Sequence, residues 1–387
     1  MKRLAYAACA VLSLVGSVQA EVALTIHYMS VERDVPPTLS NLDPRPDGLG
    51  LDGAKVALED NATTGRFLGQ TYALTHSAVP LGDDVAEAAR AALAQTPFLV
   101  VDGPSEALLT IADLPEAANA VVFNATEGDV TLRDNACRAN LLHAIPSTAM
   151  RTDALAQFLV KKRWDDLRLV AGVHAADQAY AAALQQSLRK FGLRIGDTKE
   201  WAFDADMRRN AAQEVPLFTQ DFGDYDALLI ADELGDFGRY ILYNTWEARP
   251  VAGSEGLSAV AWAPVVEQWG AVQLQNRFTE AAGRAMAPED YGAWAAVRAL
   301  GEAVTRTSSG DAAVLRDFLL GDEFELAGFK GRPLTFRPWN GQLRQPIPLV
   351  HPRALVALAP LEGFLHQRTE LDTLGLDAPE SGCAAFQ

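Results

Sequence analysis

Residues 98–124 read FLVVDGPSEALLTIADLPEAANAVVFN, and they decide the fold. The apolar run 98–101 stops at Asp102-Gly103-Pro104, a helical stretch fills 105–112, and a second apolar run ends at Asn124. Short apolar runs that alternate with helices at this spacing are typical of parallel strands in a sheet that helices cover on both faces. The stretch therefore predicts a strand–helix–strand unit of an α/β sheet.

The same alternation extends in both directions from this stretch. It runs from residue 22 to 124, breaks at about 134–146, and resumes over 148–262. Because the pattern occurs twice, we expect two similar α/β lobes, each a parallel sheet flanked by helices. Neither a barrel nor a single sheet fits a pattern that stops and starts again.

The last third of the chain has a different pattern. The apolar run 257–262 predicts the last strand of the second sheet. Two helices are expected at 266–286 and 290–306. Short strands should follow, with Asn340-Gly341 as a hairpin turn between two of them.

Residues 1–20 have the features of a secretory signal. Lys2 and Arg3 precede an apolar stretch that reaches about Val15, and the segment 17–20 places small residues where a signal peptidase reads. The apolar stretch is shorter than the roughly 20 residues that a membrane span needs. We therefore expect cleavage after Ala20 and a periplasmic protein that is not embedded in the membrane.

The chain is acidic, with 33 Lys and Arg against 50 Asp and Glu and a net charge of -17. Such a surface repels nucleic acid and anionic lipid, although a local group of arginines can still bind a small anion. The hydrophobic fraction of 49% is sufficient for a folded core. The length suggests two domains or lobes, and we expect a monomer.

Cys137 and Cys383 are the cysteines that remain after cleavage. In an oxidising compartment, two cysteines are most simply explained by a disulfide, which here would tie the C-terminal tail to the body of the protein. The alternative is two separate buried thiols.

The sequence has few signs of catalytic chemistry. Residues 48–53, GLGLDG, match the dinucleotide fingerprint, but a proline-rich loop separates them from the first strand, so close packing at the start of a helix is the favoured interpretation. The histidines are scattered and predict no zinc site. An acidic run over 221–236 could hold a hard cation, but solvated loop ends are the commoner meaning. We therefore expect a protein that is not an enzyme and carries no catalytic cofactor.

The ends of the predicted strands carry the candidate binding residues. In parallel α/β sheets, ligands bind beyond the carboxyl ends of the strands, and on two facing lobes these ends would line one cleft. The candidates at these ends are Tyr28, Asp102, Gly103, Asn124, Thr126, His174, Asp177 and Glu233.

Two tryptophans and two arginines complete the candidate set. Trp262 and Trp269 flank the last predicted strand end, where they could stack on a flat ligand or pack in the core. Arg138 and Arg151 lie near the predicted crossing between the lobes, where they could bind carboxylates or form surface ion pairs.

Several motifs carry a resemblance to a known family. Two of them are the crossing Ile145-Pro146-Ser147 and the helix start 290–294, DYGAW. In these segments the chain resembles the type I periplasmic solute-binding proteins of ABC importers, which include the branched-chain amino acid binders. A narrower branch, encoded with PQQ-dependent alcohol dehydrogenase systems, is similar in these segments: 137–140 CRAN, 268–271 QWGA, 336–346 FRPWNGQLRQP, 362–367 EGFLHQ and 369–375.

The resemblance implies a two-lobed fold with three hinge crossings that closes on its ligand. It implies lobe 1 at 21–143 with 265–325, lobe 2 at 144–264 with 326–375, and a tail at 376–387. It also implies delivery of the ligand to an ABC permease.

For the ligand, the narrower branch implies pyrroloquinoline quinone (PQQ), a flat tricarboxylated quinone. One alternative is an accessory protein that binds a PQQ-dependent dehydrogenase or delivers cofactor to it. Another is an amino acid-binding protein, although the usual serine and threonine ligands are not evident after residue 101, where the loop reads Asp102-Gly103-Pro104.

Overall fold

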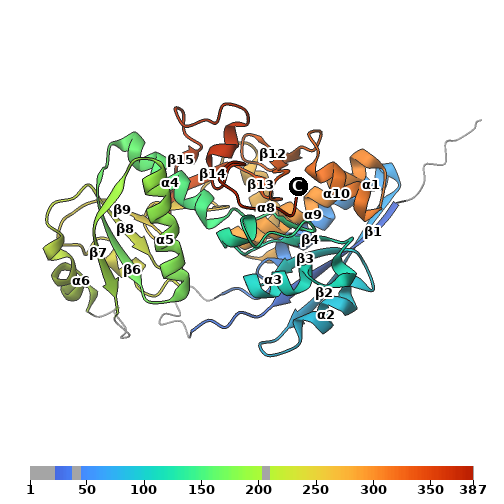
Figure 1. The fold of residues 1–387 in the computed structure, drawn as a ribbon, viewed down its shortest axis with the longest axis horizontal. Coiled ribbons are helices and arrows are strands. Elements are labelled where there is room, and N and C mark those ends of the chain that lie inside the picture. The colour runs from blue at the N-terminus through green and yellow to red at the C-terminus, as the bar shows by residue number, and fades with distance from the viewer. Residues whose placement is uncertain (1–21, 37–44, 203–209, 387) are drawn as a thin grey trace, which may run out of the picture.

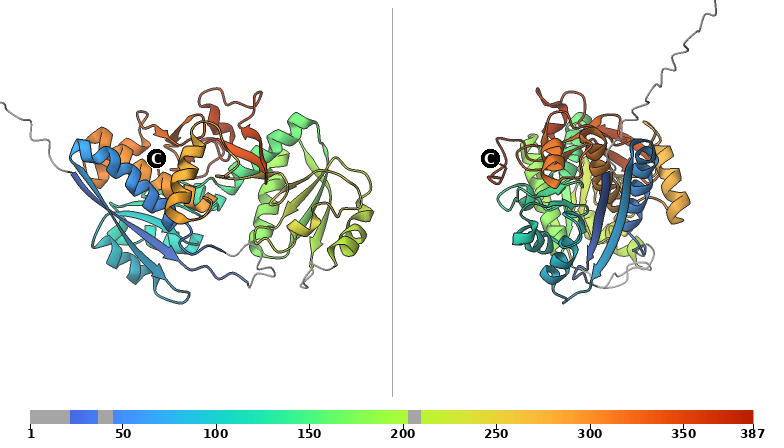
Figure 2. Two further views of the ribbon diagram at one scale, coloured as in Figure 1. Left: turned by 180° about the vertical axis from the view of Figure 1, so that it is seen from behind. Right: turned by 90° about the vertical axis from the view of Figure 1, so that its right-hand side faces the viewer.

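The computed structural model describes residues 22–36, 45–202 and 210–386. The predicted signal peptide lies outside these residues. Two α/β lobes lie side by side, and the segments that connect them pass between the lobes (Figure 1; seen from behind and from the side in Figure 2). Within the described ranges, no helix is long and apolar enough to cross a membrane.

Lobe 1 is built on a five-stranded parallel sheet with the strand order β2-β1-β3-β4-β5. Its strands are β1 (Val22–Val31), β2 (Gln70–Val79), β3 (Phe98–Asp102), β4 (Val121–Asn124) and β5 (Leu141–His143). The helices of this lobe are α1 (Leu51–Leu68), α2 (Val85–Leu93), α3 (Ser105–Ala112), α8 (Ala271–Ala282), α9 (Pro288–Thr307) and α10 (Ala312–Leu320).

Both faces of this sheet are buried. Alternate residues of β1 belong to different apolar clusters: Ile26 packs on the side of α1, α8 and α9, whereas Met29 packs on the side of α2 and α3. Val100 and Val101 of β3 divide in the same way. This double burial explains why the strands are nearly continuous apolar runs in the sequence.

Lobe 2 is built on a four-stranded parallel sheet with the order β7-β6-β8-β9. Its strands are β6 (Asp166–Gly172), β7 (Arg194–Trp201), β8 (Ala227–Ala231) and β9 (Val251–Gly253), and its helices are α4 (Thr148–Lys162), α5 (Ala175–Lys190), α6 (Ala211–Thr219) and α7 (Gly238–Ile241). An antiparallel sheet of β10 (Ser258–Ala259), β14 (Ile347–His351) and β15 (Ala354–Ala359) packs against α4.

Three segments cross between the lobes: 144–147 after β5, 260–270 before α8, and Gln345-Pro346 before β14. A small antiparallel sheet of β11 (Leu326–Ala327), β12 (Pro333–Phe336) and β13 (Leu343–Arg344) precedes the third crossing. Four single-turn 3-10 helices are also described: η1 (Pro115–Ala117), η2 (Val130–Arg133), η3 (Gln220–Phe222) and η4 (Glu370–Thr373). The predicted fold class, two parallel-sheet lobes with three crossings, is therefore confirmed.

The prediction for 257–262 was wrong. The last strand of the second parallel sheet is β9, and within 257–262 only Ser258–Ala259 forms a strand, antiparallel to β14. The apolar character of this stretch has another cause, because Trp262 packs in the core of lobe 1. The helix expected at 266–286 is shorter, since Gly270 has φ +81° and Gly283 ends it with φ +70°.

The lobe boundary predicted at residue 326 remains a prediction. Three apolar side chains of the β11–β13 sheet, Leu334, Phe336 and Leu343, pack with the core of lobe 1. In β14, Ile347 and Leu349 pack with the core of lobe 2, whereas Val350 belongs to the apolar cluster of lobe 1. Packing with lobe 2 therefore begins after the third crossing, but β14 contacts both cores.

The glycines of the segment 48–53 serve close packing of helices. A Cβ atom at Gly53 would lie 2.0 Å from the carbonyl oxygen of Asp290, so α1 and α9 meet there backbone to backbone. A Cβ atom at Gly50, whose φ is +78°, would lie 2.1 Å from the hydroxyl of Tyr28. These contacts agree with the interpretation of the segment as the tightly packed start of a helix.

We expect Gly53→Ala to lower the free energy of unfolding by about 1–3 kcal/mol, because the added methyl group forces α1 and α9 apart. Urea denaturation followed by circular dichroism measures this change. The matched control is Gly310→Ala, because the nearest atom to a Cβ there is 3.4 Å away in ordinary contact. Equal stabilities of the two variants would contradict the proposed packing.

Candidate functional site

The lobe 1 part of the candidate site lies just beyond β1, β3 and β4. The guanidinium of Arg33 donates to Asp102 Oδ1 at 2.7 Å and to Thr126 Oγ1 at 2.7 Å. The hydroxyl of Thr126 donates in turn to Asp102 Oδ1 at 2.7 Å. Gly103 contributes its carbonyl oxygen, which accepts from Arg33 at 2.9 Å. A second guanidinium, that of Arg45, lies 3.5 Å from Asp102 Oδ2.

Tyr28 lies beneath this group. Its hydroxyl is buried and, within the described part of the chain, has no hydrogen-bond partner. Burial and the nearby carboxylates of Asp102 and Asp290 raise the pKa of Tyr28 well above 10. The hydroxyl therefore stays protonated at neutral pH and keeps an unused hydrogen-bonding capacity.

The lobe 2 part of the site is an ion pair between Arg151, in the first turn of α4, and Glu233, just after β8. The pair is bidentate, with N–O distances of 2.7 and 3.0 Å, and the Arg151 Nε atom donates to the carbonyl of Ala259 at 3.0 Å. Ser254 donates to Glu233 Oε1 at 3.1 Å. Burial favours a raised pKa for Glu233, but Arg151 and Ser254 outweigh it, so the pKa of Glu233 lies below 4.5.

Tyr180 on α5 supports this pair. The guanidinium of Arg151 lies 5.1 Å from the centre of the Tyr180 ring, within the range of a cation–π contact. The hydroxyl of Tyr180 is buried and has no hydrogen-bond partner among the described residues. Burial raises its pKa, against the opposing effect of Arg151.

His174 and Asp177 shape the backbone beside the ion pair. Asp177 accepts from the backbone N–H groups of Glu233 at 2.7 Å and of His174 at 3.3 Å. His174 Nε2 lies 3.2 Å from Asp236. These contacts fix the start of α5 and the loop after β8, so both residues position the site.

Glu289 lies at the start of α9 in lobe 1. Burial raises the pKa of Glu289, while Arg45 lowers it. Burial lowers the pKa of Arg151, but Glu233, with smaller contributions from Tyr180 and Glu289, raises it, so the pKa of Arg151 lies above the ordinary value for arginine. Within the described ranges, Glu289 forms no ion pair.

Four predicted candidates lie elsewhere or already have internal partners. Arg138 pairs with Asp113 at the end of α3, and so lies toward the amino ends of the strands. The amide of Asn124 contacts His143 at 3.1 Å inside lobe 1. Trp262 is 2% exposed and stacks on Tyr291 with 4.9 Å between the ring centres. Trp269 packs against Gly331.

Five residues of the site were not predicted from the sequence: Arg33, Arg45, Tyr180, Ser254 and Glu289. Arg33 lies only five residues after Tyr28, so a longer window past the predicted strand end would include it. Tyr180 lies one helical turn after Asp177, on the same face of α5. Glu289 directly precedes the helix predicted at 290–306 and does not follow a predicted strand.

The acidic run 221–236 has a structural role in part. The carboxylate of Asp232 accepts from the backbone N–H groups of Asp236, Phe237 and Gly238 at 2.9, 2.8 and 2.6 Å, which fixes the loop after β8. In the part of the chain that the structure describes, no group of three or more His, Cys, Asp or Glu side chains is arranged to hold a metal ion.

Comparison with known proteins gives a clear result for the fold. No protein-family model and no curated protein matches the sequence. Among solved structures, a branched-chain amino acid ABC transporter periplasmic ligand-binding protein from Burkholderia xenovorans LB400 aligns with a TM-score of 0.71, 16% identity and coverage of 94% of this chain and 100% of that one. The fold is that of the type I periplasmic binding proteins.

Two further structures with the type I periplasmic binding protein fold broaden the comparison. A leucine-, isoleucine-, valine-, threonine- and alanine-binding protein from Brucella ovis aligns with a TM-score of 0.66 and 13% identity. The alignment covers 89% of this chain and 93% of that one. An ABC transporter solute-binding protein from R. palustris, in complex with benzoate, aligns with a TM-score of 0.63 and 12% identity. The alignment covers 94% of this chain and 99% of that one. These neighbours are transport binding proteins rather than enzymes. The narrower resemblance to the PQQ-associated branch remains a prediction.

Proposed function

We propose that this protein is the periplasmic solute-binding component of an ABC importer and holds a small amino acid, or a related carboxylate, between its lobes. One observation carries the proposal. Paired charges lie beyond the strand ends of each lobe, with Arg33–Asp102 in lobe 1 and the bidentate pair Arg151–Glu233 in lobe 2. Ligands of open parallel sheets bind at such ends.

The balance of charge favours a zwitterion. The arginines of the site are Arg33, Arg45 and Arg151, and its acids are Asp102, Glu233 and Glu289. The formal charges of these six groups cancel, and Asp177 beside Glu233 adds a further carboxylate. A zwitterionic amino acid leaves this balance unchanged, whereas a tricarboxylate would bring negative charge with no partner into a partly buried site. In an amino acid complex, Glu289 would accept from the ammonium group and Arg45 would donate to the carboxylate.

The structure gives less support to PQQ as the ligand. Trp262, expected as a stacking surface, lies in the core of lobe 1, and Arg138 is paired with Asp113. We therefore favour the amino acid alternative over PQQ. The permease and the dehydrogenase remain predicted partners, and no observation here favours the accessory-protein alternative.

Thermal unfolding of the mature protein with the twenty amino acids, benzoate and PQQ tests the ligand class. A ligand at a hundred times its dissociation constant stabilises by about 2.7 kcal/mol. That corresponds to a rise in Tm of roughly 5 °C or more. A saturable rise with an amino acid supports the proposal. A rise with PQQ alone would replace the amino acid by the quinone, and no rise with any compound would contradict the ligand class.

We expect Glu289→Gln to weaken amino acid binding by about 10–100-fold, because a hydrogen bond between charged groups contributes about 1.5–3 kcal/mol. Titration calorimetry with the amino acid identified above measures the change. The matched control is Glu302→Gln on the same helix, whose carboxylate pairs with Arg306 at 2.7 Å on the surface. Equal affinities for wild type and Glu289→Gln would show that Glu289 does not receive the ammonium group.

A further inference from the structure

The C-terminal segment 361–383 runs back across both lobes. It follows β15, at the side of lobe 2, and ends at the disulfide with Cys137 in lobe 1. In Figure 1 it is the dark red segment along the upper edge of the molecule, whereas the segment that follows β1 lies along the lower edge. The segment therefore lies on the opposite side of the molecule from the end of β1 and the candidate site.

Lobe 2 holds this segment through Lys190, near the end of α5, and Asp153 of α4. Lys190 Nζ donates to the carbonyl of Gly375 at 2.9 Å, to Asp153 at 3.1 Å and to Glu380 at 3.0 Å. Asp153 accepts from the backbone N–H of Gly375 at 2.8 Å. These contacts attach the C-terminal half of the segment to two helices of lobe 2.

Lobe 1 holds the end of the segment. The disulfide joins Cys383 to Cys137, with a Cα–Cα distance of 5.7 Å. The hydroxyl of Ser381 donates to the carbonyl of Arg133 at 2.9 Å. The backbone N–H of Gly382 donates to Asp134. The attachment to lobe 1 is thus partly covalent.

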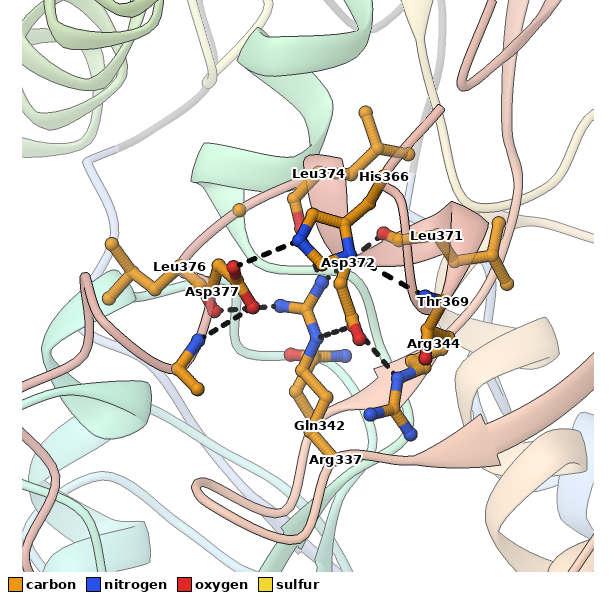
Figure 3. Close-up of polar contacts among 12 residues, drawn as sticks. Arg337, Gln342, Arg344, His366, Thr369, Leu371, Asp372, Leu374, Leu376 and Asp377 are labelled. Atoms are coloured by element: carbon orange, nitrogen blue, oxygen red, sulfur yellow. Dashed lines mark hydrogen bonds and ion pairs between the residues drawn. The ribbon is translucent and has the colours of Figure 1, made fainter. Parts of the chain in front are cut away.

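On the N-terminal side of these attachments, the segment contacts the arginines that precede the third crossing. Asp372 Oδ1 accepts from Arg337 Nε at 2.9 Å and from Arg344 Nε at 2.8 Å, and Arg344 immediately precedes the third crossing (Figure 3). Gln342, between these arginines in the sequence, donates to the carbonyl of Ile145 in the first crossing at 2.9 Å. A movement of one lobe relative to the other would strain these contacts.

We propose that residues 361–383 form an interlobe strap, which restricts the relative motion of the two lobes through its disulfide to lobe 1 and its Lys190 contacts with lobe 2. Hinged two-lobed proteins move by rotation about their connecting segments. A segment fastened to both lobes acts as an additional connection beside the three crossings. This role does not depend on the identity of the ligand or on transport.

Distances between spin labels on the two lobes test the strap. Keto-bearing phenylalanine analogues at positions 67 and 243 carry the labels, because Phe67 in lobe 1 and Tyr243 in lobe 2 are each 87% exposed. The variants are Cys137→Ser with Cys383→Ser, which removes the covalent attachment to lobe 1, and Lys190→Met, which removes the Lys190 contacts with lobe 2 and leaves the bond from Gly375 N–H to Asp153. We expect each to broaden the distance distribution at least about twofold relative to wild type.

Combination of the variants separates a strap from two local effects. If one strap restricts the lobes through both attachments, loss of either attachment should give most of the increase in the width of the distance distribution. The distribution of the combined variant should then be no wider than the wider of the two single-site distributions. The matched control is Lys199→Met, whose Nζ donates to the carbonyl of Phe218 at 2.7 Å within lobe 2. Its distances should equal those of wild type.

Amide hydrogen exchange over 361–383 checks whether the strap is released in each variant. Release should raise the exchange rate in this segment by about tenfold or more relative to wild type. A released strap with unchanged interlobe distances would overturn the proposal and leave the segment a local stabiliser. Additive broadening in the combined variant would overturn it as well. If the serine variant does not fold, Lys190→Met alone carries the same comparison.

Discussion

Asp372→Asn is expected to lower the free energy of unfolding by about 3–5 kcal/mol, which is the usual cost of removing one partner from a buried ion pair. Asp372 is the carboxylate that Arg337 and Arg344 share, and the side chains of Arg337 and Asp372 are 1% and 4% exposed. Burial lowers the pKa of Arg337, and Asp372 opposes this effect. Asparagine keeps the shape of aspartate but leaves both guanidinium charges without their counter-charge.

Urea denaturation of wild type and variant measures this loss. Asp221→Asn is the control, because Asp221 is 77% exposed and lies 3.8 Å from Lys199, so its change should stay within about 0.5 kcal/mol. Arg337 also donates to the carbonyl oxygens of Leu374 and Leu376 at 2.7 and 3.1 Å. A loss below about 1 kcal/mol for Asp372→Asn would mean that these carbonyl oxygens suffice to hold the charge.

Replacement of both cysteines by serine should lower the free energy of unfolding by about 2–5 kcal/mol. The disulfide joins residues separated by 246 positions, so it restricts a large part of the unfolded chain. In the chain-entropy view, the stabilisation rises with the length of the closed loop. The serine variant loses this restriction while it keeps side chains of similar size.

Unfolding in urea with and without dithiothreitol checks the origin of this effect. Reduced wild type should lose about as much stability as the serine variant, and dithiothreitol should leave the variant unchanged. If the variant were as stable as oxidised wild type, the disulfide would contribute nothing to the folding equilibrium, whatever its role between the lobes.

Much of the fold could be predicted because the sheets are buried on both faces. The bounds predicted for α3 agree with the structure, since Pro104 marks a clear helix start. The strand β5 was missed because it has three residues, Leu141–His143, inside a polar stretch. Such a short strand forms because it pairs with β4, and the residues of β5 alone do not indicate this pairing.

The candidate site was predictable where it lies directly at strand ends. Asp102, Thr126 and Glu233 meet this condition. Tyr180 does not, because its place under Arg151 depends on how α5 packs on the sheet of lobe 2. Trp262 shows the opposite error, since a tryptophan after an apolar run can turn toward either lobe, and only the stacking on Tyr291 places it in the core of lobe 1.

The distance along the chain between the parts of lobe 1 has a consequence for the timing of folding. Asn61 in α1 donates to the carbonyl of Val297 in α9 across 236 residues, and Phe336 packs in the same apolar cluster as Ile26. Because the N-terminal residues are made first, this apolar cluster cannot be completed until nearly the whole chain is available. Lobe 1 therefore reaches its native state only after lobe 2 has been synthesised, and its apolar strands need protection from aggregation during the wait.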